Sequence, residues 1–250
     1  MPLTIVLGRW YCQGVSMRNA FNRQAEKPAA PIQRPSGLAN EIYEAIYAQL
    51  MSLKINPGSR ITVDNLVREL NVSHTPIREA LGRLEGEGLV VKTHLVGFSA
   101  APQITRRQFE ELYELRLRLE PHAAGIAAAR MTDESLAALT EAAGTMGRRG
   151  DGTDERVRYS LFARQDADFH DMLVGIAGND LIRGTLGHLH THFHIFRLMF
   201  HSRVTEEALE EHERILQALQ SGDGAAAEAA MRDHISRSRD RLLPAFEDDA

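Results

Sequence analysis

The chain has 250 residues, and its 43% hydrophobic and 25% charged content is typical of a soluble globular protein with one large domain or two ordinary ones. No apolar run approaches the roughly 20 residues that a membrane span needs, and the single cysteine, Cys12, excludes an internal disulfide. A cytoplasmic location without a membrane partner is therefore expected. The net charge of −5 does not by itself indicate a nucleic-acid binder, so local charge has to decide that question.

Residues 1–37 predict a flexible arm, because they contain four prolines and show no sustained hydrophobic periodicity. Met17 is an alternative start to Met1 and would shorten this arm. The arm is basic, since against the single acid Glu26 it carries Arg9, Arg18, Arg23, Lys27 and Arg34.

Residues 38–101 predict the order helix, helix, turn, helix and hairpin. Apolar residues recur at every fourth position from Ile42, which indicates the first helix, and Pro57 with Gly58 ends that pattern. Short runs between turn residues indicate the remaining elements. The second helix and the two hairpin strands are expected at 64–70, 89–91 and 97–99. This order is that of a winged helix-turn-helix.

The stretch NVSHTPIREAL, residues 71–81, predicts the start of the third helix. Ser73 is a suitable N-cap whose hydroxyl can accept from the free amides of the first turn. Pro76 then falls in that turn, where its missing N–H costs little. The apolar residues recur at helical spacing and face inward, which leaves on the other side His74, Thr75 and Arg78.

The polar residues at this helix tip suit contact with DNA. A helix N-terminus carries exposed amides and a positive dipole, and it therefore favours phosphate. In helix-turn-helix proteins the N-terminal residues of the recognition helix reach base edges in the major groove. An ordinary capped helix with a solvated face is the alternative, but the preceding short helix and the following hairpin favour the DNA-binding interpretation.

The segment PGSRITVDNLVRELNVSHTPIREALGRLEGEGLV resembles the DNA-binding domain of the GntR family of bacterial transcription regulators. The shared features are a Pro-Gly turn, a short helix, the Val-Ser-x-Thr-Pro-x-Arg-Glu-Ala-Leu stretch, a Leu-x-x-Glu-Gly-Leu stretch and a wing with glycine. The resemblance spans about residues 38–101. It implies that Ser73, Thr75 and Arg78 contact operator DNA and that Gly97 shapes the wing.

Two positions depart from the family pattern. The family usually has arginine at the position of His74, and it usually has Glu-Arg-Glu where this chain has Val63, Asp64 and Asn65. A neutral imidazole cannot make the bidentate contact of arginine to guanine. Residues 38–101 carry six basic and seven acidic side chains, a net charge of −1. We therefore expect modest electrostatic affinity and an altered operator preference, with the basic arm supplying part of the attraction to phosphate.

After Pro102 almost every segment predicts helix, and turn residues separate six helices. These helices are expected at 105–130, 133–147, 154–177, 180–201, 205–220 and 223–243. No strand signal appears there, so residues 102–246 predict an all-α antiparallel six-helix bundle. The chain is thus expected to be mainly α, with an N-terminal winged helix-turn-helix followed by this bundle.

One carboxylate and three imidazoles fall on the inward faces of three predicted bundle helices. Asp166 and His170 are four residues apart on one helix, and His212 and His234 lie on two others. A single inward histidine is usually a satisfied core residue. Four such groups together favour a shared divalent cation, because burying them separately is costly. Zinc is the first choice of metal, with nickel or manganese as alternatives.

The bundle resembles the FCD domain, the effector domain of the FadR subfamily, and its six helices resemble the shorter VanR-like members. Metal-binding members carry Asp-x-x-x-His, then a histidine before an Ile-Leu-x-Ala-Leu-like run, then another histidine about two dozen residues later. By this resemblance the metal ligands are Asp166, His170, His212 in HERILQAL and His234 in MRDHISRS.

Further polar residues are candidates for ligand binding. Arg116 is expected to face the bundle interior, where Glu120 is either its structural partner or its neighbour in a bidentate clamp for a ligand carboxylate. The run HLHTHFH, residues 188–194, contains i, i+4 pairs that suit chelation, although several of its histidines are expected to be solvated. His190 and Arg197 flank the apolar stripe and are candidates for lining a pocket.

The leading hypothesis is a homodimeric transcription regulator, not an enzyme, that binds double-stranded palindromic operator DNA. A metal in the bundle would hold a small organic-acid effector that modulates this binding. A metal sensor, in which the metal itself is the signal, is one alternative. A metal-dependent enzyme with an accessory helix-turn-helix is the other, with Glu120 as the general base to nominate.

Overall fold

The structure, a computed structural model of the chain, describes residues 36–146, 155–198 and 202–246. The predicted basic arm lies outside these residues except for Ser36 and Gly37, which begin the first helix. None of the helices in the described ranges is long and apolar enough to cross a membrane.

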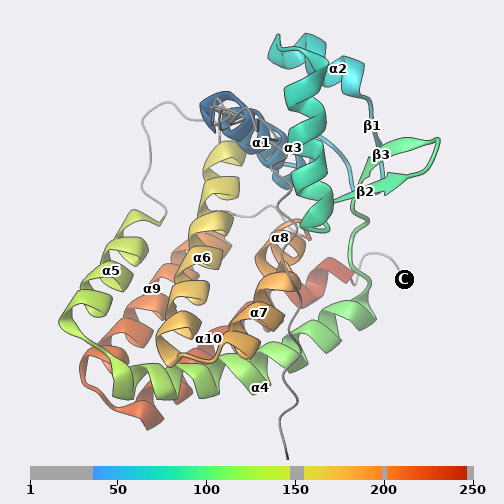
Figure 1. Cartoon of the computed structure of the whole chain (residues 1–250). Helices are drawn as coiled ribbons and strands as arrows, with labels where there is room; N and C mark the ends of the chain where they lie inside the picture. The colour runs from blue at the N-terminus through green and yellow to red at the C-terminus, as the bar shows by residue number, and fades with distance from the viewer. Residues whose placement is uncertain (1–35, 147–154, 199–201, 247–250) are drawn as a thin grey trace, which may run out of the picture. The chain divides into compact units, whose positions relative to one another are not determined.

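The N-terminal part is a winged helix-turn-helix with a small three-stranded sheet (Figure 1). Its elements are α1 (Ser36–Met51), β1 (Arg60–Ile61), α2 (Val63–Leu70), α3 (His74–Gly86), β2 (Val90–Thr93) and β3 (Gly97–Ala100). The strand β3 lies in the middle and pairs antiparallel with both β1 and β2, so that Ser99 faces Arg60 on one side and Val91 on the other. The predicted order of elements is confirmed. The two-residue strand β1 was not predicted, because it is too short to show an alternating pattern.

The recognition helix α3 is held by apolar contacts on its inner face. Its three residues at the predicted inward positions have no exposed surface, namely Ile77, Leu81 and Leu84. They belong to the same core as Ile46 and Leu50 of α1. Asn71 ends α2 in the left-handed conformation, with φ of 52°, which asparagine adopts more readily than most residues. The chain therefore turns sharply into α3 and leaves the polar side of that helix facing solvent.

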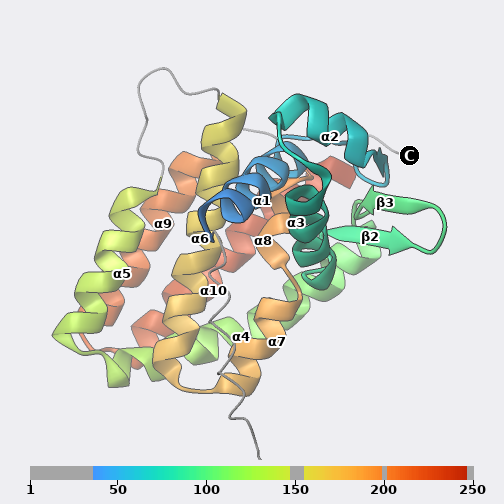
Figure 2. The same ribbon diagram turned by 45° about the horizontal axis from the view of Figure 1, so that its top comes forward.

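The C-terminal part is entirely helical in the described residues (Figures 1 and 2). Its helices are α4 (Arg106–Arg130), α5 (Asp133–Thr145), α6 (Glu155–Ala177), α7 (Asp180–His188), α8 (Thr191–Phe196), α9 (Ser202–Gln220) and α10 (Gly224–Leu242), followed by the short 3-10 helix η1 (Leu243–Phe246). The prediction of a helical bundle is confirmed, although one predicted helix is divided into two. In both views α10 runs beside α4.

Two local features bring α10 close to α4. Pro121 lies inside α4 and has no N–H, so the carbonyl of Leu117 loses its helical partner. Arg232 of α10 donates to this carbonyl across a distance of 3.3 Å. A Cβ atom on Gly224 would lie only 2.9 Å from the carbonyl oxygen of Gly125. Glycine at the start of α10 is therefore needed for the close approach of the two helices.

The helix predicted at 180–201 is broken in the middle. The helix α7 ends at His188, and α8 begins at Thr191 after His190, which has φ and ψ of 43°. Histidine enters this left-handed region more readily than most non-glycine residues, but hydrophobic periodicity does not reveal such a break. The i, i+4 histidine pairs expected in residues 188–194 are consequently not on one continuous helix.

Candidate metal centre and nucleic-acid interface

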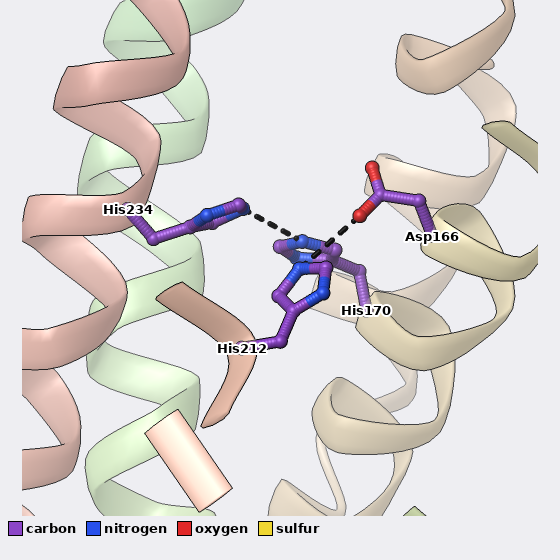
Figure 3. Close-up of side chains that lie close together, drawn as sticks. All are labelled: Asp166, His170, His212 and His234. Atoms are coloured by element: carbon purple, nitrogen blue, oxygen red, sulfur yellow. Dashed lines mark hydrogen bonds and ion pairs between the residues drawn. The ribbon is translucent and has the colours of Figure 1, made fainter. Parts of the chain in front are cut away.

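Three helices bring one carboxylate and three imidazoles together inside the bundle (Figure 3). Asp166 and His170 come from α6, His212 comes from α9 and His234 comes from α10. Each residue is at most 4% exposed, and their potential ligand atoms all lie within 4.8 Å of one another. The structure thus assembles the four residues that the sequence predicts as metal ligands.

The two imidazoles of His170 and His234 face each other, with their Nε2 atoms 3.2 Å apart. The other ring nitrogen of each, Nδ1, lies beside a carboxylate, 2.6 Å from Glu120 Oε2 for His170 and 2.8 Å from Glu211 Oε2 for His234. An ionised carboxylate only accepts hydrogen bonds, so both Nδ1 atoms carry the proton. In neutral rings both Nε2 lone pairs then point at one another. Facing lone pairs repel, and a cation that accepts both of them removes the repulsion.

Asp166 and His212 also present unsatisfied atoms to the same space. The Oδ1 atom of Asp166 lies 3.1 Å from Nε2 of His212, yet neither atom has a hydrogen-bond partner among the described residues. Buried polar atoms without partners are costly, and a metal ion is one way to satisfy them. Burial alone raises the pKa of Asp166, but the nearby imidazoles of His192 and His212 outweigh this effect and hold the pKa well below its usual range. The carboxylate is therefore charged and available as a ligand.

Glu211 contacts the Nδ1 atom of His234, and Arg241 in turn holds Glu211. Arg241 donates to both carboxylate oxygens of Glu211, with distances of 2.6 and 2.9 Å. Burial raises the pKa of Glu211, but its bonds with His234 and Arg241 outweigh this and lower the pKa to about 2. A histidine that binds a metal through one nitrogen typically donates its other N–H to such a carboxylate. The sequence did not reveal this role, because Glu211 simply precedes His212 and its partners are distant along the chain.

Glu120 has the same relation to His170, and Arg116 holds it in place. The guanidinium of Arg116 donates from Nε to Glu120 Oε1 at 2.6 Å and from Nη2 to Oε2 at 3.3 Å. Both residues are buried. The structure thus shows the ion pair of Arg116 with Glu120 that the sequence offered as one of two readings, and the carboxylate clamp stays a prediction. Burial raises the pKa of Glu120, but Arg116 and His170 outweigh it and keep the carboxylate ionised.

A cavity of about 250 Å³ opens beside the cluster. Its lining includes three residues of the cluster region, Glu120, His170 and His192. His190, which the sequence offered as a pocket residue, also lines it, whereas Arg116 and Arg197 are not among the described lining residues. Pockets of this kind suit small metabolites.

His192 is a neighbour of the cluster that the sequence did not single out. It comes from α8, is 9% exposed, and places Nε2 3.3 Å from Oδ2 of Asp166. Its ring centroid lies 5.0 Å from that of His170. Burial lowers the pKa of His192 to about 3, so the ring is neutral. The run at 188–194 offered several equivalent histidines, and only the break at His190 decides which of them turns toward the cluster.

Arg197, the residue after α8, contacts the connecting segment, residues 101–105, which joins β3 to α4. Its Nη2 donates to the carbonyl of Ala101 at 3.0 Å, and Gln103 donates to the carbonyl of Arg197 at 3.4 Å. The guanidinium also lies over the ring of Phe193, 4.5 Å from its centroid. It is 1% exposed, and burial lowers its pKa to about 10. This candidate pocket residue therefore contacts the connecting segment instead of the cavity.

The expected DNA-contacting residues are exposed at the N-terminus of α3, namely Ser73, His74, Thr75 and Arg78. Ser73 occupies the N-cap position, but its side chain makes no capping hydrogen bond, so that expectation was wrong. One of the two usual donors is absent, because the third residue of the helix is Pro76, which has no N–H to donate. The hydroxyl of Ser73 and the guanidinium of Arg78, which has no described ion pair, are left available to another partner.

The wing borders the same surface. Gly97 begins β3 with φ of 110°, a backbone conformation that residues with a side chain rarely adopt. At the tip of the wing, Leu95 is 94% exposed. A shallow groove between α3 and the wing is lined by Asp64, Arg78 and Lys92 among other residues. A recognition helix and a basic wing residue thus face one groove.

A winged helix-turn-helix with an exposed polar recognition helix, joined to a helical domain with a buried polar site, defines a DNA-binding transcription regulator. Residues 38–99 match the bacterial regulatory proteins of the gntR family, and residues 111–237 match the FCD domain. The chain belongs to the GntR family, and its C-terminal part is an FCD domain of the kind found in FadR-like regulators.

Two relatives of this chain are transcription regulators. The HTH-type transcriptional regulator LutR of Bacillus subtilis is 31% identical over 218 residues, which cover 78% of this chain and 96% of LutR. The Nta operon transcriptional regulator of Aminobacter aminovorans is 35% identical over 136 residues, or 54% of this chain and 62% of that protein. These relatives are regulators, and this chain is likewise a regulator and not an enzyme.

Solved structures show the same fold. The Escherichia coli protein McbR/YncC has a TM-score of 0.62 at 19% identity, covering 85% of this chain and 99% of that one. A GntR transcriptional regulator from Rhodococcus sp. RHA1 has a TM-score of 0.60 at 20% identity, covering 82% and 97%. At these identities the likeness is one of architecture.

Proposed function

We propose that this regulator contains a metal ion and that a small carboxylate-bearing metabolite modulates its operator binding. One observation carries the proposal, namely that the cavity of about 250 Å³ touches His170, a member of the buried cluster. A ligand in this cavity would lie next to the groups that we propose as metal ligands.

The charges around the cluster favour an anionic ligand. The carboxylates of Glu120 and Glu211 are offset by Arg116 and Arg241, respectively. A divalent cation bound by Asp166 and three neutral imidazoles would therefore leave a net charge of about +1 at the centre. Zinc suits such a set of nitrogen and oxygen ligands, and nickel and manganese are the alternatives.

His192 and His190 supply polar groups on the wall of the cavity. The Nε2 atom of His192 has no hydrogen-bond partner among the described residues, although the side chain is buried. An oxygen atom of the metabolite would provide that partner if the ring turned Nε2 toward the cavity, because this atom has almost no exposed surface. A site that leaves a polar group unpaired without its ligand discriminates strongly against molecules that lack the matching group.

The short helix α8 offers a route from the cavity to the DNA-binding domain. It carries His192 at the cavity, and Arg197, just beyond its last residue, donates to the carbonyl of Ala101 in the connecting segment. A ligand that favours one position of α8 would therefore favour one position of this segment. Coupling of this kind requires that the ligand bind the two positions with different affinity.

On the DNA side, Ser73, His74, Thr75 and Arg78 would contact the operator, and Gly97 would shape the wing that lies beside it. Two copies of the chain, joined through the bundle, would place two recognition helices on the half-sites of a palindromic operator, about one helical turn apart. A protein of this kind works in the cytoplasm, where bacterial operator DNA is.

A metal-responsive regulator is the second candidate function. The observation that favours it is the pair of facing lone pairs on His170 and His234. Without a cation these rings would have to move apart or take up a proton, so metal loss by itself would rearrange the bundle.

The deciding experiment is fluorescence anisotropy of the full chain on DNA from its own upstream region, beside a scrambled duplex of equal length. Protein treated with chelator and protein reloaded with zinc are compared, each with and without short mono-, di- and tricarboxylic acids. An acid that changes operator affinity only in the zinc form supports the leading proposal. A change on zinc loading alone, with no response to any acid, supports the metal-responsive alternative. Equal affinity for both duplexes contradicts operator binding.

A further inference from the structure

The tip of the recognition helix carries a hydrogen bond that the proposed function does not use. His74 is the first residue of α3, and Asp64 is the second residue of α2. The Nε2 atom of His74 lies 2.8 Å from Oδ1 of Asp64. Both side chains are exposed, His74 to 55% and Asp64 to 73%. Neither makes another side-chain hydrogen bond in the described part of the chain.

This contact decides which nitrogen of the His74 ring carries the proton. An ionised carboxylate can only accept, so the proton must be on Nε2. A neutral imidazole has one N–H, and Nδ1 is consequently left as an acceptor. Asp64 also limits rotation of the ring, because rotation would break the hydrogen bond. The exposed His74 ring at the helix tip thus keeps one acceptor, Nδ1, for which the described residues show no partner.

We infer that His74, positioned by Asp64, is a base-reading residue that selects adenine or cytosine. In the major groove the donors are the N6 amino group of adenine and the N4 amino group of cytosine, whereas guanine and thymine offer only acceptors on that edge. An acceptor at the helix tip therefore matches the first two bases and repels the others. This inference rests on the proposed contact of α3 with operator bases and adds the class of base that is read.

The expected discrimination is that of one hydrogen bond. A single protein–base hydrogen bond corresponds to about three- to tenfold in affinity. An arginine in place of His74 would instead bind guanine through two hydrogen bonds. Its preference for guanine should be larger than the preference of His74 for adenine or cytosine. The two side chains therefore predict different operator sequences, which makes the inference testable without knowledge of the natural operator.

Asp64 has two effects that separate its positioning role from its charge. Its negative charge repels phosphate, so Asp64→Ala should raise affinity for every duplex. The same change frees the ring of His74, so discrimination at the contacted base should fall toward that of His74→Ala. Glu79→Ala is the matched control, because Glu79 is an exposed acid on α3 without a described contact to His74. It should raise general affinity and leave discrimination unchanged.

The test is selection from a randomised duplex library with the full chain at about pH 8. Wild type, His74→Ala and His74→Arg are compared, and the contacted position is the one at which His74→Ala loses preference. Affinities for the four bases at that position are then measured by anisotropy, together with Asp64→Ala and Glu79→Ala. We expect wild type to prefer adenine or cytosine by about three- to tenfold and His74→Arg to prefer guanine.

The outcomes separate this inference from the proposed function. Enriched sequences in which His74→Ala changes no position, or in which wild type prefers guanine or thymine there, overturn the inference and leave operator binding intact. Full discrimination in Asp64→Ala overturns the positioning role of Asp64. No enriched sequence for wild type contradicts both the inference and operator recognition by α3.

Discussion

The two polar sites of this regulator differ in how their side chains are held. In the bundle, the cluster residues are buried, and two of the three histidines have a carboxylate behind the ring. At the tip of α3, the polar residues are exposed, and within the described residues Ser73 and Arg78 have no side-chain hydrogen bond or ion pair. A buried site is organised before its ligand arrives, whereas Ser73 and Arg78 at the exposed helix tip have no such support.

The same difference determines how much each site lowers the stability of the folded protein. Buried polar atoms without partners among the described residues, such as Oδ1 of Asp166 and Nε2 of His212, destabilise the fold unless a ligand satisfies them. Exposed hydroxyl and guanidinium groups are solvated and cost little. Metal should therefore influence both the stability and the ligand response of the bundle, while substitutions on the helix tip should affect DNA binding alone.

The largest effect is expected from His212→Ala. This fully buried side chain would supply one of the four proposed ligand groups, so its loss should weaken zinc binding by more than about 100-fold and remove the response to organic acids. Metal content after dialysis, measured by mass spectrometry, checks the prediction. His188→Ala, which removes an exposed histidine outside the cluster, should keep the metal. Equal metal content in both variants would contradict the assigned ligand set.

A smaller loss is expected from Glu211→Gln. The amide keeps the shape of the side chain but removes the charge that fixes the His234 ring, so zinc affinity should fall about 10- to 100-fold. Competition with a metal chelator of known affinity measures this change. Glu210→Gln alters an exposed acid on the same helix and should have no effect. An unchanged affinity in Glu211→Gln would mean that Glu211 does not support a metal-binding histidine.

At the recognition helix, Arg78→Ala should weaken specific operator binding by about 5- to 150-fold, because it removes an exposed guanidinium. Its metal content should equal that of wild type. Anisotropy on the selected operator and on a scrambled duplex measures the effect. Arg118→Ala removes the same charge from the exposed face of α4 and should bind the operator like wild type. Equal losses in both variants would point to a general charge effect.

The smallest effect is expected from Ser73→Ala on stability. Its hydroxyl makes no capping bond, so the free energy of unfolding should change by less than about 0.5 kcal/mol. Thr105→Ala is the matched change, because Thr105 accepts from the amide of Gln108 in a complete capping box, and it should cost about 1 kcal/mol. Urea denaturation compares the two. Equal destabilisation would show that Ser73 does cap α3 in solution.

The fold was predictable because its elements have strong local signals. Proline, glycine and capping residues mark the helix ends, and apolar spacing marks their inner faces, as in Ile77, Leu81 and Leu84. The break at His190 was not predictable, since the apolar pattern continues through it. The strand β1 was missed because two residues show no period and are fixed only by pairing with β3.

The candidate site was predictable only in part, for a similar reason. Asp166, His170, His212 and His234 lie at helical spacing on inward faces, and periodicity can identify such positions. Glu211 and His192 have no comparable signal. Their roles depend on which side chains from other helices stand opposite them, and this depends on packing angles and on the turn at His190.

The sequence by itself therefore determined the order of helices, the identity of the recognition helix and the four inward polar residues, because these follow from spacing along one chain segment. The tertiary structure decided which ring nitrogens face each other. It also decided that Arg116 forms an ion pair with Glu120 and that His74 forms a hydrogen bond with Asp64. Hydrogen bonds between distant segments require distances and orientations in space, and periodicity along the chain does not contain them.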